Sequence, residues 1–222
     1  MGKSSLFIAI AAAALTVSVW AFFNQPDHEP SWPARIQGFA FSPYRANEDA
    51  IKDQLPTDTE IDSDLALLSG KTNAVRTYSV EGTLGDIPVL ADKHNINVAL
   101  GVWIDGDRES NAAQIKRAIH IAWHNTNVVR VIVGNETILH NQVPVYELGA
   151  YLDQVRKQVN QPVSTAEPWY TWIQHPELVK HVDFLAVHML PFWESVNVDV
   201  AVDYIAQRMH DLQKAYPRKP IV

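Results

Sequence analysis

The segment VVRVIVGNE, residues 128–136, decides the fold that the sequence predicts. Its first six residues are nearly all β-branched, which is typical of a strand covered by helices on both sides of its sheet. A glycine, an amide and a carboxylate follow at once as Gly134, Asn135 and Glu136. We therefore predict a buried parallel strand that carries polar side chains at its carboxyl end.

Short apolar runs and helical patterns alternate along the chain from Arg35 onward. The predicted strands cover residues 36–41, 74–77, 97–103, 128–133, 162–166 and 183–188, and another strand begins at 220–222. The first predicted helix begins at a capping box of Thr57 and Glu60, and two short ones cover residues 85–94 and 175–181. Apolar stripes predict three further helices, over 115–123, 148–159 and 201–212, and the first of these stripes ends at Trp123.

This alternation implies parallel βαβ units and an α/β fold. Six units and the start of a seventh predict an incomplete (β/α)8 TIM barrel over residues 35–222. A doubly wound open sheet is the alternative, although no glycine-rich phosphate loop follows any of the predicted strands.

Composition excludes several classes of function. Hydrophobic residues make up 47% of the 222 residues and charged residues 19%, which is typical of a folded globular protein. The absence of cysteine excludes disulfides, thiolate metal sites and cysteine nucleophiles. A net charge of −7 without a basic cluster argues against nucleic-acid binding. Nothing in the sequence calls for a metal or an organic cofactor.

The N-terminal residues form a separate segment. Residues 6–23 are eighteen residues without a charge, which is just sufficient to cross a bilayer. Lys3 precedes this run, and Asp27 and Glu29 follow it. This arrangement favours an N-terminus in the cytoplasm and a domain outside. We therefore expect contact with the lipid bilayer through residues 6–23.

A cleaved signal peptide is the alternative to an anchor. The apolar part of a signal peptide usually spans about 7–15 residues and ends at small residues. Here the run is longer and closes with bulky side chains, including Trp20 and Phe23. We predict an uncleaved anchor over residues 1–23 and a linker over 24–34.

Polar and aromatic side chains collect where the predicted strands end, which is the face that carries the chemistry of (β/α) barrels. They are Arg76, Thr77 and Tyr78; Trp103 and Asp105; Asn135 and Glu136; Glu167 and Trp169; and His188, Trp193 and Glu194. Each of these residues alone is more often a structural one. Aromatic rings pack on sugar rings, and a carboxylic acid protonates a glycosidic oxygen, so their recurrence at successive strand ends favours a carbohydrate site with Glu136 as the acid.

Five segments carry a family resemblance. They are Gly38–Tyr44, Val75–Tyr78, Val133–Glu136, Ser164–Trp169 and Val187–Glu194. In this order, over residues 35–222, the chain resembles bacterial members of glycoside hydrolase family 17. The resemblance implies a (β/α)8 barrel that acts on β-1,3-glucan with retention of configuration, by hydrolysis or by transfer to another sugar.

The resemblance also implies roles for residues. Glu136 is then the general acid/base, and Asn135 bonds the 2-hydroxyl of the sugar. The residues expected to bind substrate in the cleft are Tyr78, Trp103, Glu167, Trp169, His188 and Trp193. Of these, His188 is also a candidate to orient the nucleophile.

The nucleophile of this family is a glutamate just after the seventh strand, which here lies beyond Val222. The chain is then expected to be a fragment, and a membrane glycosyltransferase domain or partner would suit its anchor. The expected location is the bacterial inner membrane, with the domain facing the periplasm. A catalytically inactive, membrane-anchored glucan-binding module is the alternative, and an unrelated metal-dependent barrel hydrolase is a weaker one.

Overall fold

The computed structural model describes residues 2–25, 31, 33–46, 48 and 54–222, which fall into two compact units, Met1–Ala34 and Arg35–Val222. The first unit contains α1 (Lys3–Phe23). Its segment Ser4–Phe23 has a mean hydropathy of 2.3 and is long and apolar enough to cross a membrane, a property that signal sequences share. The acidic residues Asp27 and Glu29, and residues 26–30 and 32 of the predicted linker, lie outside the described residues.

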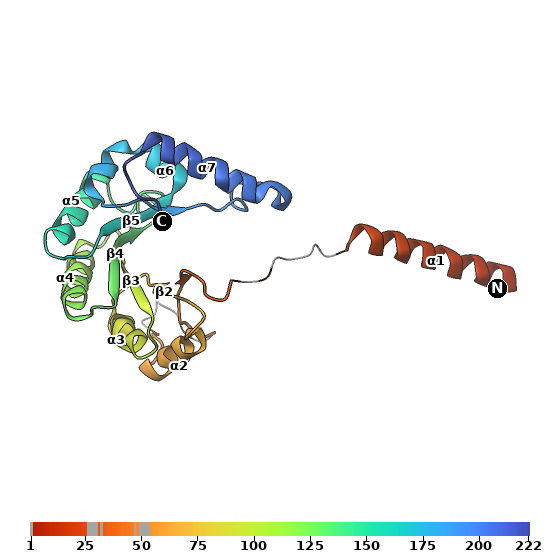
Figure 1. The fold of residues 1–222 in the computed structure, drawn as a ribbon, viewed down its shortest axis with the longest axis horizontal. Helices are drawn as coiled ribbons and strands as arrows, with labels where there is room; N and C mark the ends of the chain where they lie inside the picture. Colours follow the sequence, from red (N-terminus) through yellow and green to blue (C-terminus); the bar gives the residue numbers. More distant parts are fainter. Residues whose placement is uncertain (1, 26–30, 32, 47, 49–53) are drawn as a thin grey trace. The chain divides into compact units, whose positions relative to one another are not determined.

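The second unit is built on one parallel sheet (Figure 1). Its strands are β1 (Phe39–Ala40), β2 (Ala74–Arg76), β3 (Asn97–Val102), β4 (Val128–Asn135), β5 (Val163–Pro168) and β6 (Ala186–His188). They lie side by side in the order β1-β2-β3-β4-β5-β6, and every neighbouring pair is parallel. A doubly wound sheet would reverse its order at a switch point, so this alternative is excluded.

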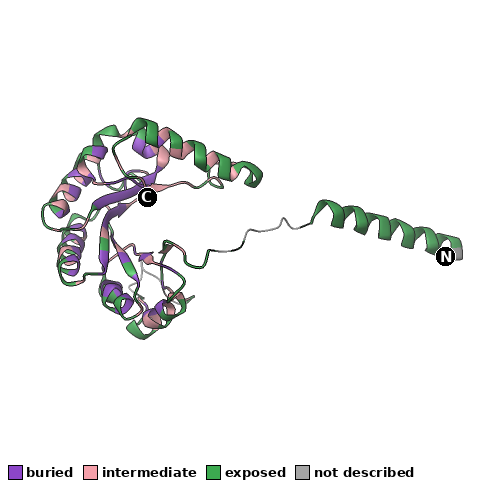
Figure 2. Ribbon diagram, viewed as in Figure 1, coloured by how far each residue is buried: buried purple, intermediate pink, exposed green. Residues whose placement is uncertain are grey.

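Helices cover the outer side of the curled sheet (Figure 1). They are α2 (Asp58–Leu68), η2 (Gly82–Asp86), α3 (Ile87–Asp92), α4 (Arg108–His124), α5 (Val145–Arg156), α6 (Trp169–Gln174), η3 (Pro176–His181), η4 (Val198–Val200) and α7 (Ala201–Ala215). The buried residues concentrate in the strands and on the sheet-facing sides of α3, α4 and α5 (Figure 2). The predicted α/β arrangement of repeated βα units is confirmed.

Local sequence explains where two of the helices begin. The capping box is confirmed at α2, where the Glu60 backbone N–H bonds the Thr57 hydroxyl and the Glu60 carboxylate accepts from the Thr57 backbone N–H at 2.9 Å. At α4, the Asp107 carboxylate accepts from the backbone N–H groups of Glu109 and Ser110. Both caps satisfy N–H groups that a helix leaves without partners in its first turn.

Three features illustrate where the structure differs from the sequence prediction. The first strand is confined to β1, although Ile36 pairs with Thr72 ahead of it. The helix α6 was not predicted and follows β5 without a loop. Trp123 was predicted on the buried stripe of α4 but is 62% exposed, and its indole N–H bonds the Gln158 carbonyl at 2.6 Å. The buried face of α4 is centred on Ile115 and Ala118, which leaves Trp123 at its border.

The predicted start of a further strand is confirmed at residues 220–222. Ile221 forms a parallel bridge with Leu185. The Leu185 backbone N–H bonds the Pro220 carbonyl at 2.8 Å, and the Val187 N–H bonds the Val222 carbonyl at 2.8 Å. The sheet thus continues past β6 in the same direction.

Strands β2 and β3 approach each other closely at Gly101. A Cβ atom at this position would lie 2.1 Å from the Thr77 carbonyl oxygen and 2.5 Å from the Tyr78 Cα. The Gly101 backbone N–H bonds the Thr77 hydroxyl at 2.9 Å, and the Thr77 N–H bonds the Ala99 carbonyl at 3.1 Å. This contact fixes the backbone that leads from β2 into Tyr78.

Candidate active site

The carboxyl end of β4 turns sharply into the site. Gly134 and Glu136 both have positive φ, 88° and 53°. A Cβ atom on residue 134 would lie 2.6 Å from the Thr137 hydroxyl, so the turn requires glycine there. The Glu136 backbone N–H still bonds the Ala166 carbonyl of β5 at 2.8 Å. Glu136 is thus anchored to the sheet while its carboxylate projects from the turn.

Four side chains from three strands form one hydrogen-bonded chain. His188 Nδ1 lies 2.6 Å from Glu136 Oε1, and His188 Nε2 lies 2.8 Å from Arg76 Nη1. The second guanidinium nitrogen of Arg76 donates to Asn135 Oδ1 at 2.6 Å. These contacts bring together the ends of β2, β4 and β6, so the predicted residues Asn135, Glu136 and His188 lie in one site.

This chain of contacts assigns the tautomer of His188. A guanidinium can only donate, so His188 Nε2 must accept from Arg76. The proton of a neutral imidazole then lies on Nδ1 and is donated to Glu136. Burial lowers the pKa of the Arg76 guanidinium, and the charge of Glu136 and the hydroxyl of Tyr78 oppose this effect. The arrangement thus makes a neutral His188 the donor to Oε1 of Glu136.

His140 is a second histidine beside Glu136. Its Nε2 lies 3.4 Å from Glu136 Oε2, four residues along the same turn, and its side chain is exposed. Sequence analysis missed His140 as a site residue and named Arg76 only as a strand end. The spacing of four residues from Glu136 is the signal that could have pointed to His140.

Glu167 lies beneath the site rather than in a cleft. Its side chain has no exposed surface, and its carboxylate accepts from the backbone N–H groups of Ile138 at 2.9 Å and Leu139 at 3.3 Å. Burial raises the pKa of the Glu167 carboxyl to about 7, against the opposing effect of these N–H groups. Contact with a sugar was expected for Glu167, but in this arrangement the turn after Glu136 covers it.

Trp169 is tied to the segment around α7. Its indole N–H bonds the Glu194 carboxylate at 3.0 and 3.2 Å, and the Tyr204 hydroxyl donates to the same carboxylate at 2.6 Å. The Arg208 guanidinium lies 4.8 Å from the centroid of the Trp169 ring. One face of Trp169 is therefore occupied, whereas Trp193 is 76% exposed.

A hollow of about 670 Å³ lies at the ends of β1, β2 and β3. Its lining includes Tyr44, Tyr78, Trp103 and Asp105. The Trp103 indole N–H bonds Asp105 at 3.1 Å, and the Tyr78 ring centroid lies 4.8 Å from the guanidinium carbon of Arg76. The hollow therefore adjoins the chain of contacts that ends at Glu136, and it offers aromatic faces beside polar groups.

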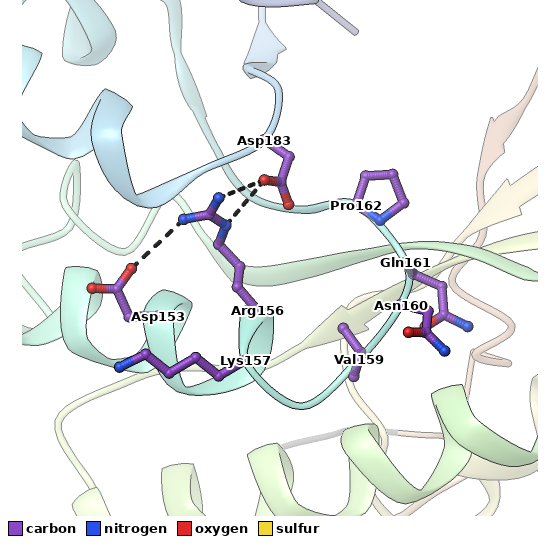
Figure 3. A pocket seen from close by; sticks show the side chains of 8 residues that line it. All are labelled: Asp153, Arg156, Lys157, Val159, Asn160, Gln161, Pro162 and Asp183. Atoms are coloured by element: carbon purple, nitrogen blue, oxygen red, sulfur yellow. Dashed lines mark hydrogen bonds and ion pairs between the residues drawn. The ribbon is translucent and has the colours of Figure 1, made fainter.

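A second hollow, of about 510 Å³, lies at the opposite ends of the strands (Figure 3). It is next to Pro162 and Asp183, which lead into β5 and β6. Three of its charged side chains contact one another: Arg156 donates to Asp183 at 2.7 and 3.0 Å and lies 3.8 Å from Asp153. The carboxyl ends of the strands therefore hold the better candidate site.

Comparison with known proteins gives the same fold and a family. Residues 38–222 match the family model described as the BtgE/BtgC glycoside hydrolase domain. A β-1,3-glucanosyltransferase of Rhizomucor miehei, solved as an active-site mutant with laminaritriose, superposes with a TM-score of 0.73 at 25% identity, covering 84% of this chain and 69% of that one. An endo-laminarinase from Formosa shares the fold, with a TM-score of 0.72 at 17% identity over 84% of this chain and 64% of that one.

Curated fungal proteins are also similar to this chain. A probable glucan endo-1,3-beta-glucosidase of Aspergillus terreus is 24% identical over 200 residues, which cover 83% of this chain and 30% of that protein. A probable family 17 glucosidase of Saccharomyces cerevisiae is 25% identical over 173 residues, or 76% of this chain and 43% of that protein. The chain thus spans less than half the length of these relatives. It belongs to the BtgE/BtgC glycoside hydrolase domain family, within glycoside hydrolase family 17.

Proposed function

We propose that this protein acts on β-1,3-glucan as a retaining glycosidase or transglycosylase, with Glu136 as its general acid/base. The observation that carries the proposal is the Glu136 carboxylate at the end of β4, bonded to His188 at 2.6 Å beside a hollow with aromatic walls. The relatives support the substrate class, because one is a β-1,3-glucanosyltransferase solved with laminaritriose and another is a probable glucan endo-1,3-beta-glucosidase.

In this mechanism, Glu136 gives a proton to the glycosidic oxygen as the bond to the leaving sugar breaks. In the second half-reaction it takes a proton from water or from the hydroxyl of an acceptor sugar. The His188 Nδ1–H donates to Glu136, so it stabilises the carboxylate that remains after the first proton has left. His188 is thus proposed to act on the acid/base, rather than on the nucleophile as first expected.

Asn135 has a defined orientation for substrate binding. Its Oδ1 accepts from Arg76, which directs its amide N–H groups to other partners. We propose that one of them donates to the sugar 2-hydroxyl, a contact that strengthens in the transition state. Tyr78, Trp103 and Trp193 are proposed to pack against sugar rings, Trp169 with the face that Arg208 leaves open.

Retention requires a second carboxylate about 5–5.5 Å from the first. Two other carboxylates at the strand ends are poor candidates for the nucleophile, because Glu167 is fully buried and Glu194 accepts from Trp169 and Tyr204. We propose that the nucleophile is a glutamate that follows the strand begun at residues 220–222. This proposal rests on the family resemblance.

Incubation of the full-length gene product with laminari-oligosaccharides tests the function. Mass spectrometry is expected to detect new β-1,3-glucans, with cello-oligosaccharides as an unreactive comparator. Products longer than the substrate indicate transfer, and only shorter products indicate hydrolysis. Binding of laminari-oligosaccharides without any product would instead support the inactive glucan-binding module. Turnover of the β-1,4 comparator alone would contradict the proposed substrate.

We further propose that α1 anchors the second unit to the outer face of a bacterial inner membrane, where a membrane glycosyltransferase domain or partner could supply glucan. The length and hydropathy of Ser4–Phe23 support an anchor. We expect the protein to remain in the membrane pellet after alkaline carbonate washing, and a variant that lacks residues 2–34 to be released. A soluble wild-type protein with a cleaved N-terminus, identified by mass spectrometry, would support a signal peptide instead.

A further inference from the structure

We propose that Glu167 is a positioning residue, whose buried carboxylate holds the turn that carries Glu136 through the backbone N–H groups of Ile138 and Leu139. The inference rests on the proposed function for its effect on catalysis. The holding contact itself is a property of the fold and can be measured without any substrate.

Glu167 and the residue before it contact the backbone both at Glu136 and just after it. The residue before it, Ala166, accepts the Glu136 backbone N–H at 2.8 Å. Its own carboxylate accepts from the N–H groups two and three residues after Glu136. The backbone of β5 and the side chain of Glu167 thus bracket Glu136, which has a left-handed φ of 53°. An L-residue adopts this conformation only where its surroundings enforce it.

The held turn also carries His140. The His140 N–H bonds the Glu136 carbonyl at 2.9 Å, and the Gln142 N–H bonds the Thr137 carbonyl at 2.9 Å, so residues 136–142 form one compact turn. A displacement at Ile138 would therefore move the Glu136 carboxylate relative to His140 and to His188, which lies on β6. Small displacements of a reacting group cost large factors in rate.

The contact with the turn explains why a carboxylate is buried at Glu167. A carboxylate in the interior is unfavourable unless it is well bonded. Within the described part of the chain, Glu167 forms no ion pair with lysine or arginine, and the nearby Glu136 carboxylate raises its pKa further. Backbone N–H groups of the turn are its bonded partners. An apolar residue would fill the same space without this penalty, but it could not hold the turn.

Nuclear magnetic resonance of the wild-type protein tests the contact directly. As pH rises through about 7, Glu167 loses its proton and becomes a stronger acceptor, so the amide protons of Ile138 and Leu139 are expected to move downfield together. The titration is expected to persist in Glu136→Gln at a lower pH, because the Glu136 carboxylate no longer raises the pKa of Glu167. Amide protons of Ile138 and Leu139 that exchange with solvent as fast as unbonded ones would overturn the proposal.

Glu167→Gln tests the consequence for catalysis. The amide keeps one acceptor oxygen but turns an N–H group towards the backbone N–H of the turn. We expect kcat to fall about 10- to 100-fold with KM within about twofold of the wild-type value. Hydrogen exchange at Ile138 and Leu139 is expected to accelerate at least about 10-fold. Unchanged exchange and unchanged kcat in a folded variant would refute the positioning role.

Asn127→Asp is the matched control, because it exchanges an amide for a carboxylate at another buried residue. Asn127 bonds the carbonyls of Pro88 and Ile96 at the amino end of β4, away from Glu136. We expect this variant to lose stability without the selective change at Ile138 and Leu139. If wild-type protein is inactive on every glucan but its amides titrate as expected, the function fails while the contact stands.

The pH dependence of thermal stability should also differ between the wild type and Glu167→Gln. The folded pKa of Glu167 is about 7, above its ordinary value of 4.5, so the folded state binds the proton more tightly than the unfolded state. Its contribution to stability is therefore present below pH 4.5 and is lost as pH rises to about 7. We expect this slope in the wild type and not in Glu167→Gln.

Discussion

Glu136→Gln is expected to lower the rate of glucan turnover about 100- to 10,000-fold, because the amide fits the same space but delivers no proton. Binding of laminari-oligosaccharides, measured by calorimetry, should change far less. The deficit in kcat/KM, which reports the first half-reaction, should shrink on a synthetic glucoside with a dinitrophenyl leaving group, which departs without needing a proton. This dependence on the leaving group separates loss of the acid from general damage to the site.

Glu177→Gln serves as the control for this prediction, since it makes the same exchange at an exposed residue that contacts His175. It is expected to retain wild-type activity. If Glu136→Gln keeps wild-type activity on natural glucan, the assigned acid/base is wrong. If its deficit in kcat/KM is equal for good and poor leaving groups, Glu136 does not act as the acid.

Gly101→Ala is expected to destabilise the second unit by about 3 kcal/mol or more, because the added carbon would meet backbone rather than a movable side chain. It would lie 2.1 Å from the Thr77 oxygen and 2.5 Å from both the Thr77 carbonyl carbon and the Tyr78 Cα. Strands β2 and β3 would have to separate. A fall in Tm of roughly 6–12 °C is the expected result in a calorimetric scan.

Gly106→Ala provides the comparison, since a Cβ atom there would lie 3.9 Å from its nearest neighbour, the Gln142 carbonyl oxygen. Its effect on Tm should be small. An equal loss in both variants would mean that glycine flexibility, rather than close approach, explains the cost at Gly101. Because Gly101 packs against the backbone of Thr77 and Tyr78, a folded Gly101→Ala protein should also bind glucan less tightly.

The sequence predicted the strands well because burial on both faces leaves a direct compositional signal. The β-branched run at 128–133 forms the first six residues of β4, and the capping box of Thr57 and Glu60 marks the start of α2. The helix α6 escaped prediction because Trp169, Tyr170 and their neighbours have no clear apolar period. Short helices gain their stability from tertiary packing, and Trp172 of α6 is fully buried.

The polar and aromatic side chains at the strand ends were predicted as a set, but the hydrogen bonds between them were not. Register between parallel strands brings Asn135 beside Ala166, and this contact between strands decides that Glu167 turns beneath the site. No local pattern distinguishes a buried carboxylate from one that lines a cleft. Likewise, the pairing of Arg76 with His188 joins residues 112 positions apart, which only the curvature of the sheet brings together.

The order of the strands has a consequence for how the protein is made. Each strand pairs with the strand synthesised just before it, so a ribosome-bound chain can add βα units one at a time onto an existing edge, with short loops to close. Arg76 emerges early, yet its partner His188 follows only 112 residues later. At about 5–20 residues per second, the nascent chain holds that guanidinium without its imidazole for roughly 6–22 seconds. The site is therefore completed last, after most of the scaffold has been translated.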